Sequence, residues 1–300
     1  MLFVPGDNER KRARARQSAA DALILDLEDS VAPSRKAQAR LEVAEQLRAD
    51  RRGAALWVRI NPLADDAWIA DLDAVLDARP DGLVLPKPRS ADDVVRLSER
   101  LDEIEPRLGV ARGSTRILPI ATETASSVLS LGDYARSSPR LAALTWGAED
   151  LSVALGAETA VDEHGDWLPP YRLARSLCLL AAAAAGVAAI DTVHANFRDV
   201  AGFVRRAREA KRDGFAGALL IHPDQVAIAN EIFRPGADEV ERARRIVAVF
   251  EASPGSGVVS LDGRMLDRPH LERARRVLAL ASRITRKEND RCRSSTESTT

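Results

Sequence analysis

Two short apolar segments that end in carboxylates are the part of this sequence most suited to chemistry. They are Arg116–Glu123, which ends in Glu123, and Ala142–Leu151, which carries Glu149 and Asp150 close to its end. Apolar runs of this length indicate buried strands, and α/β folds place ligands and catalytic groups at the carboxyl ends of such strands. Mg²⁺ typically takes one or two carboxylates and keeps positions for water and substrate oxygens. The two acidic strand ends therefore predict a site for one hard divalent cation.

Further polar side chains close other apolar runs, and in a barrel these ends converge. An acid-rich mouth with one arginine and one lysine suits a metal that binds an anionic, oxygen-bearing substrate. Arg59 needs an anion, and a planar carboxylate matches its guanidinium. Two roles remain open for the His222 side chain, a catalytic role and a hydrogen bond to the backbone. The predicted rim comprises Glu28, Asp29, Arg59, Lys87, Glu123, Glu149, Asp150, Asp191 and His222.

The elements that must position these residues alternate regularly along the chain. Eight strand-like runs, each followed by an amphipathic helical stretch, predict parallel βαβ units and an α/β fold closed as a (β/α)₈ TIM barrel. Neither a G-x-G-x-x-G after the first strand nor a P-loop supports an open nucleotide-binding sheet. Besides the two runs above, the predicted strands are Leu2–Val4, Ala22–Leu27, Leu56–Ile60, Gly82–Leu85, Val187–Ile190 and Ala216–Ile221.

Composition excludes several classes of partner. The 300 residues carry 44 Lys and Arg against 45 Asp and Glu, so charge gives no argument for nucleic acid or an anionic membrane. Cys178 and Cys292 suggest neither a disulfide framework nor a zinc motif, which favours a reducing, cytoplasmic location. No stretch resembles a signal peptide or a membrane-spanning helix.

Three regions are expected along the chain: a TIM barrel over residues 1–235, a C-terminal helical extension or lid over 236–286, and a disordered tail over 287–300. The glycine-rich stretch Ser253–Gly257 predicts a hinge, and Asp262-Gly263 a tight hairpin turn. The long loop Glu158–Pro170 over the barrel mouth is a further functional candidate.

An ordered set of motifs resembles the citrate lyase β-subunit-like branch of the HpcH/HpaI aldolase family, which includes citryl-CoA, malyl-CoA and citramalyl-CoA lyases. The resemblance covers residues 2–285. It implies an Mg²⁺-dependent TIM barrel that acts on CoA thioesters of hydroxy acids as a homo-oligomer, a homotrimer or a hexamer. The matching motifs are Leu2–Gly6, Ile24–Pro33, Val58–Asn61, Leu85–Lys87, Glu123–Ala125 and Gly147–Leu151.

The resemblance also implies roles for residues at the matched positions. Glu123 and Asp150 would be the metal ligands, and Arg59 would hold the substrate carboxylate or carbonyl. Glu28 and Asp29 would organise the water shell of the metal. The further substrate-binding candidates are Lys87, Gly147 and Ala148.

The C-terminal segment Gly263–Asp267 resembles the arm of the same family, whose acidic residue reaches the site of a neighbouring subunit. Asp267 would therefore be the acid or base that completes the site in an oligomer. A positioned acid or base typically contributes about 10²–10⁴-fold to a rate.

The expected reaction cleaves or forms the C–C bond of a hydroxyacyl-CoA, giving acetyl-CoA and a keto acid. Thioester hydrolysis or malate synthase-like chemistry on the same site is the nearest alternative. Two others remain open: a CoA-independent class II pyruvate aldolase, and a non-catalytic subunit that binds an acyl carrier.

Overall fold

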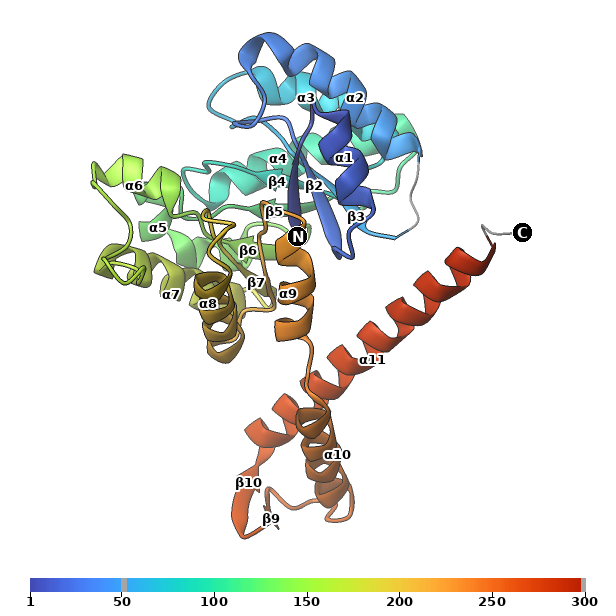
Figure 1. Cartoon of the computed structure of the whole chain (residues 1–300), viewed down its shortest axis with the longest axis vertical. Helices are drawn as coiled ribbons and strands as arrows, with labels where there is room; N and C mark the ends of the chain where they lie inside the picture. Colours follow the sequence, from blue (N-terminus) through green and yellow to red (C-terminus); the bar gives the residue numbers. More distant parts are fainter. Residues whose placement is uncertain (50–52, 298–300) are drawn as a thin grey trace. The chain divides into compact units, whose positions relative to one another are not determined.

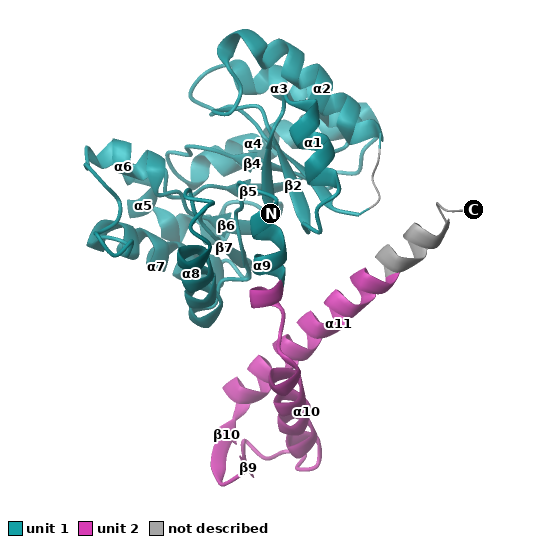
Figure 2. Ribbon diagram, viewed as in Figure 1, with its two compact units in different colours: residues 1–230 teal, residues 231–300 magenta. Residues whose placement is uncertain are grey.

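The computed structural model describes residues 1–49 and 53–297, with side chains described to residue 289. The chain divides into two compact units, residues 1–230 and residues 231–300 (Figure 2). None of the described helices is long and apolar enough to cross a membrane.

Eight parallel strands form the centre of the first unit, one for each apolar run predicted from the sequence (Figure 1). β1 to β5 pair in chain order in one sheet, and β6 to β8 pair in chain order in a second. The strands are β1 (Leu2–Pro5), β2 (Ala22–Asp26), β3 (Ala55–Arg59), β4 (Gly82–Leu85), β5 (Arg116–Pro119), β6 (Ala143–Thr145), β7 (Ala188–Asp191) and β8 (Gly217–Ala218).

Parallel bridges join the two sheets at both seams. At one seam the amide of Phe3 donates to the carbonyl of Leu220 (2.8 Å). At the other, Ile120 bridges Thr145, and the amide of Ala121 donates to the Thr145 carbonyl (2.7 Å). β1 therefore meets the segment after β8, and β5 meets β6, which gives the predicted (β/α)₈ barrel.

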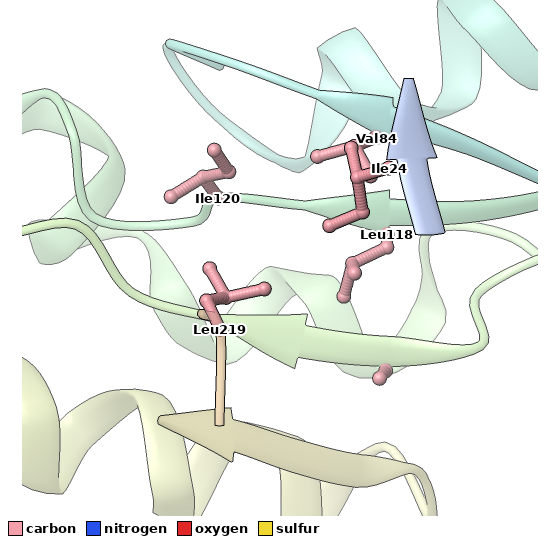
Figure 3. Close-up of a cluster of buried hydrophobic side chains, with 6 residues drawn as sticks. Ile24, Val84, Leu118, Ile120 and Leu219 are labelled. Atoms are coloured by element: carbon pink, nitrogen blue, oxygen red, sulfur yellow. The ribbon is translucent and has the colours of Figure 1, made fainter. Parts of the chain in front are cut away.

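Side chains from alternate strands fill the barrel interior (Figure 3). One buried cluster contains Ile24 of β2, Val84 of β4, Ala143 of β6 and Leu219 directly after β8, together with Leu118 of β5. Contact among residues of the even-numbered strands in the interior is the packing expected of a TIM barrel, and Ile120, just after β5, joins the same cluster. The barrel is therefore a packed core, and its functional surface lies at the strand ends.

Helices follow the strands, and several begin at side-chain caps. Ser90, Thr124 and Asp199 each accept a hydrogen bond from a backbone amide in the first turn of α4, α5 and α8. The helices of this unit are α1 (Glu9–Arg16), α2 (Lys36–Ala49), α3 (Ala67–Val75), α4 (Ala91–Ile104), α5 (Ala125–Leu129), α6 (Glu149–Leu155), α7 (Pro169–Ala184), α8 (Val200–Asp213) and α9 (Asp224–Phe233), which runs into the second unit. Short 3₁₀ helices are η1 (Pro33–Arg35), η2 (Leu76–Ala78), η3 (Glu105–Leu108) and η4 (Leu131–Arg136).

The second unit has its own small core. α10 (Ala237–Glu251) packs with α11 (Arg268–Glu297) and with a hairpin of β9 (Val258–Leu261) and β10 (Arg264–Asp267). Asp262 and Gly263 both have positive φ, as a two-residue hairpin turn requires.

The predicted limits of the three regions stay a prediction. One difference is plain within the tail expected to be disordered: α11 continues through Glu297, because the polar residues after 286 include few helix breakers. The last residues of that predicted tail, 298–300, lie outside the described residues.

Candidate active site

A cavity of about 650 Å³ lies at the carboxyl ends of the barrel strands. Its lining includes residues at or just after the ends of β2, β3, β5, β6, β7 and β8. The cavity therefore has the position that active sites take in TIM barrels. Eight of the predicted site residues line it: Asp29, Arg59, Glu123, Gly147, Ala148, Glu149, Asp150 and His222.

Arg59 is held by a carboxylate that the sequence reasoning missed. Asp26 is its register partner on the neighbouring strand, and Nε and Nη2 of Arg59 each donate to one Asp26 oxygen at 2.7 Å. A third contact joins Nη1 of Arg59 to Glu28 Oε2 at 2.7 Å. Burial by itself would lower the pKa of Arg59, but the bonds to Asp26 outweigh it and leave the pKa raised. The guanidinium is therefore always charged and fixed in one orientation.

Asp26 also organises the loop after its own strand. Its two oxygens accept hydrogen bonds from the amides of Glu28 (2.9 Å) and Ser30 (3.2 Å). Burial raises the pKa of Asp26, yet Arg59 and these donors outweigh burial, so the pKa is lowered and the side chain stays ionised. The signal in the sequence was a single carboxylate inside an otherwise apolar strand.

Lys87 connects the acidic residues around the cavity. Its Nζ donates to Glu28 and to Asp29 Oδ2 (2.7 Å), and it lies 3.5 Å from Asp150 Oδ1. Burial lowers the pKa of Lys87, but the bonds to Asp29 and Glu28 outweigh it and raise the pKa. Lys87 also has a φ of 48°, an uncommon conformation for a residue with a side chain. This backbone turns its amide toward Glu123.

Glu123 is almost completely buried directly beyond β5. The amide of Lys87 donates to its Oε2 at 2.5 Å. Burial raises the pKa of Glu123 well above its ordinary value, and the charges of Asp150 and Glu28 raise it further. Such a carboxylate favours a bound cation, because the cation offsets both the burial and the repulsion from its acidic neighbours.

Gly147 leaves the space that Glu123 occupies. A Cβ atom at position 147 would lie 2.8 Å from Cγ and 3.3 Å from Oε1 of Glu123. The backbone amide of Gly147 donates a hydrogen bond to Thr122 Oγ1 (3.1 Å). The close approach of this backbone to a buried carboxylate explains why glycine stands here.

The donor set fits Mg²⁺. Glu123 and Asp150 line one cavity, and hard cations prefer oxygen ligands such as their carboxylates. The described residues contain no group of three His, Cys, Asp or Glu side chains arranged to hold a metal. Two carboxylates leave positions for water and substrate, as Mg²⁺ sites commonly do.

Other residues that line the cavity are apolar, aromatic or cationic. Phe197 stacks on the ring of His222, with centroids 4.7 Å apart and planes 14° from parallel. Lys11 and Arg14 line the same cavity together with Ile221. The cavity thus combines acidic residues with a surface suited to an apolar chain bearing anionic groups. Phe197 lies in the loop after β7 and had no signal in the strand pattern.

Three further residues from the sequence analysis have identifiable polar partners. Asp191 is a structural partner: it accepts from Trp146 Nε1 (2.5 Å) and pairs with Arg175 (3.2 Å). His222 lines the cavity, and its Nδ1 accepts from the amide of Asp224 (3.3 Å), so the expected backbone hydrogen bond is present and a catalytic role stays a prediction. Asp267 ends β10 in the second unit, where its Oδ1 lies 2.5 Å from Nδ1 of His270.

Comparison with known proteins gives a consistent result. The model of the HpcH/HpaI aldolase/citrate lyase family matches residues 1–223. The chain is 38% identical over 291 residues to the citrate lyase subunit beta of Haemophilus influenzae, covering 96% of this chain and 98% of that one. It is 34% identical over 287 residues to a (3S)-malyl-CoA thioesterase of Cereibacter sphaeroides, covering 95% and 94%.

A solved structure is similar over most of the chain. It is the protein CitE of Mycobacterium tuberculosis in complex with magnesium, acetoacetate and coenzyme A. The TM-score is 0.76 at 33% identity, and the match covers 94% of this chain and 97% of that one.

Proposed function

Because the chain belongs to the HpcH/HpaI aldolase/citrate lyase family, we propose that it is an Mg²⁺-dependent lyase of hydroxyacyl-CoA thioesters of the citryl, malyl or citramalyl type. Its reaction cleaves or forms a C–C bond and interconverts the thioester with acetyl-CoA and a keto acid. The observation that carries this proposal is the pair of carboxylates, Glu123 and Asp150, in one cavity with the fixed guanidinium of Arg59.

Glu123 and Asp150 are the proposed metal ligands. When bound, Mg²⁺ supplies a positive charge that polarises the hydroxyl, keto and carboxylate oxygens of the substrate. Lys87 links the neighbouring carboxylates Glu28 and Asp29 to Asp150, and Glu28 and Asp29 would orient water around the metal.

Arg59 is the proposed substrate anchor. Asp26 engages Nε and Nη2 of its guanidinium and Glu28 engages Nη1, so the remaining N–H groups of Nη1 and Nη2 keep a constant direction and are the ones proposed to donate to a substrate carboxylate or carbonyl. Such a fixed cation stabilises negative charge as it develops and needs no rearrangement during the reaction. Gly147 and Ala148 would contribute the wall against which the substrate lies.

Cleavage requires two proton movements around one bond. The hydroxyl group loses a proton, and the electron pair of the C–C bond passes to the carbon beside the thioester carbonyl. That carbon takes up a proton, so the products are acetyl-CoA and a keto acid. Asp267 of a second copy of the chain is the proposed proton carrier, which makes the active enzyme a homo-oligomer, a trimer or a hexamer. A cytoplasmic location accompanies this proposal.

The CoA portion has a place at the apolar end of the same cavity. Phe197 and Ile221 suit the pantetheine chain of CoA, and Lys11 and Arg14 suit the phosphate groups of CoA. Hydrolysis of the thioester is the second candidate function, favoured by the malyl-CoA thioesterase among the relatives. The two reactions need the same ligands and differ in whether water attacks the acyl carbon.

A substrate panel tests the proposal. Purified protein with Mg²⁺ is incubated with malyl-, citramalyl- and citryl-CoA, and acetyl-CoA, keto acid and free CoA are quantified. Lyase activity gives acetyl-CoA and keto acid in equal amounts, whereas thioesterase activity gives free CoA and the hydroxy acid. Turnover of a free hydroxy acid without CoA would instead favour the pyruvate aldolase, and absence of any turnover would favour the carrier-binding subunit.

A further inference from the structure

A second large cavity lies outside the candidate active site, between α7, α8 and the turn at Gly165–Trp167. Its volume is about 840 Å³. We call it the arginine groove, because six arginines and three carboxylates line it. The arginines are Arg172, Arg175, Arg205, Arg206, Arg208 and Arg212.

The three carboxylates leave several of these arginines without a partner. Asp213 pairs with Arg175 (2.7 Å) and Arg212 (3.1 Å), and Glu209 lies 3.7 Å from Arg212. The third carboxylate, Asp166, reaches only Arg205, at 3.9 Å. Within the described part of the chain, no carboxylate lies in ion-pair distance of Arg172, Arg206 or Arg208.

Arg206 is the most informative of the three because it is half-buried. Its Nη2 donates to the carbonyl of Gly165 (2.8 Å), and its guanidinium lies 3.9 Å from the ring centroid of Trp167. These contacts fix the group without neutralising it. Burial lowers the pKa of both Arg206 and Arg175. Asp191 and Asp213 outweigh burial at Arg175, whereas the carboxylates around Arg206 do not, and its pKa stays lowered.

The unpaired cations indicate the chemistry of the missing partner. A guanidinium presents a planar fork of donors that matches phosphate oxygens. Arg172 comes from α7, and Arg206 and Arg208 come from α8 (Figure 1). An anion whose charge is spread over two linked groups can meet cations from both helices better than a single phosphate can.

The groove also shares a wall with the candidate active site. Trp167 borders the groove and contacts Trp146 edge to face, with centroids 4.9 Å apart. Trp146 borders the active-site cavity, and its Nε1 donates to Asp191, which pairs with Arg175 of the groove. A ligand in the groove therefore lies against a tryptophan that reports on it.

We propose that the arginine groove is a binding site for a ligand carrying a diphosphate group, separate from the catalytic cavity. Arg206, Arg172 and Arg208 supply the charge, and Trp167 forms one side of the site. The diphosphate has two possible sources: free pyrophosphate, or the diphosphate of a larger molecule such as CoA.

Titration of the full-length protein with inorganic pyrophosphate tests this proposal. Binding is followed by calorimetry and tryptophan fluorescence, without Mg²⁺ and at constant ionic strength, so that neither the metal site nor simple screening contributes. We expect saturable binding that Arg206→Gln weakens at least about tenfold, the loss of one charge-assisted interaction. The double variant Arg172→Gln/Arg208→Gln changes only exposed side chains, and it should weaken binding by a similar factor without affecting the fold.

Two control variants and a second ligand make the result decisive. Arg112→Gln removes an exposed arginine outside the groove and should leave the Kd unchanged. Arg14→Gln alters the end of the catalytic cavity proposed for the CoA phosphates, so it reports any pyrophosphate bound there, and it should leave intact the binding that Arg206→Gln weakens. Titration with CoA identifies the source: loss of CoA affinity in Arg206→Gln assigns the site to CoA, and retained affinity assigns it to a separate diphosphate. Pyrophosphate affinity that Arg14→Gln lowers and the groove variants leave intact would overturn the proposal, as would equal effects of all variants.

Discussion

Asp26 and Arg59 are in register on neighbouring parallel strands, and their side chains form two parallel hydrogen bonds of 2.7 Å at the base of the active-site cavity. Bidentate pairs of this kind fix direction as well as charge. Asp26 is therefore a positioning residue, which acts on the reaction through the orientation of Arg59.

The exchange Asp26→Asn tests this role. Asparagine keeps the shape but replaces one acceptor oxygen with a donor, so Arg59 loses its fixed orientation. We expect kcat/KM for the best hydroxyacyl-CoA to fall on the order of 10²-fold, the usual effect of losing one aligned electrostatic contact. Asp93→Asn is the matched control, because Asp93 is also buried and arginine-paired but lies outside the cavity. A folded Asp26→Asn variant with unchanged kcat/KM would contradict the prediction.

Gly147→Ala should weaken Mg²⁺ binding without disturbing the barrel. The new methyl group would lie 2.8 Å from Cγ of Glu123 and 3.2 Å from Cγ2 of Ile120, so the Glu123 side chain must shift. We expect the Mg²⁺ concentration for half-maximal activity to rise on the order of tenfold. Gly132→Ala is the control, since a Cβ atom there meets nothing within 4 Å. Equal Mg²⁺ dependence of the two variants would show that the space beside Glu123 is not needed.

Neutralising either proposed metal ligand should abolish turnover. Glu123→Gln and Asp150→Asn keep the side-chain volume but remove the charge that holds a divalent cation. We expect calorimetric Mg²⁺ binding to be lost in both, with circular dichroism unchanged. The exposed Asp133 serves as the control position, and Asp133→Asn should bind Mg²⁺ as the parent does. Near-normal activity of either ligand variant at the same Mg²⁺ concentration means that the assignment is wrong.

Acid stability should depend on a buried ion pair far from the cavity. Glu105 accepts from Arg140 Nη2 (2.7 Å) and from the amides of Gly113 and Thr115 (each 2.8 Å). Burial raises the pKa of Glu105, but these donors outweigh burial and lower it below 4.5. A carboxyl group whose pKa is lower in the folded state than in the unfolded state stabilises the folded protein at pH values above its unfolded-state pKa. This contribution is lost as the pH falls through the folded-state pKa.

Glu105→Gln should therefore lower the free energy of unfolding at pH 7 by roughly 3–5 kcal/mol, the usual cost of breaking a buried pair. Denaturant titrations at decreasing pH should show the difference from the parent shrinking below about pH 4.5, where the parent loses the same charge. Glu103→Gln removes an exposed carboxylate paired with Arg100, and should change the free energy by less than about 1 kcal/mol. A difference that stays constant with pH would exclude Glu105 as the cause.

The fold and most of the acidic residues at the site could be predicted from the sequence. Each barrel strand is an apolar run, and the residues that end these runs meet at one rim whatever the exact register. Glu123, Asp150 and Lys87 were identified in this way, and the structure brings them together. Their individual roles remain predictions.

What the sequence could not give depends on register and on loops. Asp26 lies inside the predicted apolar run Ala22–Leu27 rather than after it, so its pairing with Arg59 becomes visible only when β2 and β3 are aligned. The stack of Phe197 on His222 joins two loops whose paths no periodicity determines. The helical continuation of α11 beyond residue 286 depends on propagation from the preceding turns, which a composition-based expectation of disorder ignores.

The last prediction concerns the arm that ends in Asp267. In its own unit the side chain of this carboxylate pairs with His270, at 2.5 Å, so a catalytic role requires a site outside that unit. Asp267→Asn should lower kcat by about 10²-fold or more, with Mg²⁺ affinity and thermal stability little changed. Oligomers that mix Asp267→Asn with Glu123→Gln chains should regain part of the activity, because some sites then combine an intact metal pair with an intact arm. If demonstrably mixed oligomers stay inactive, Asp267 does not act between subunits.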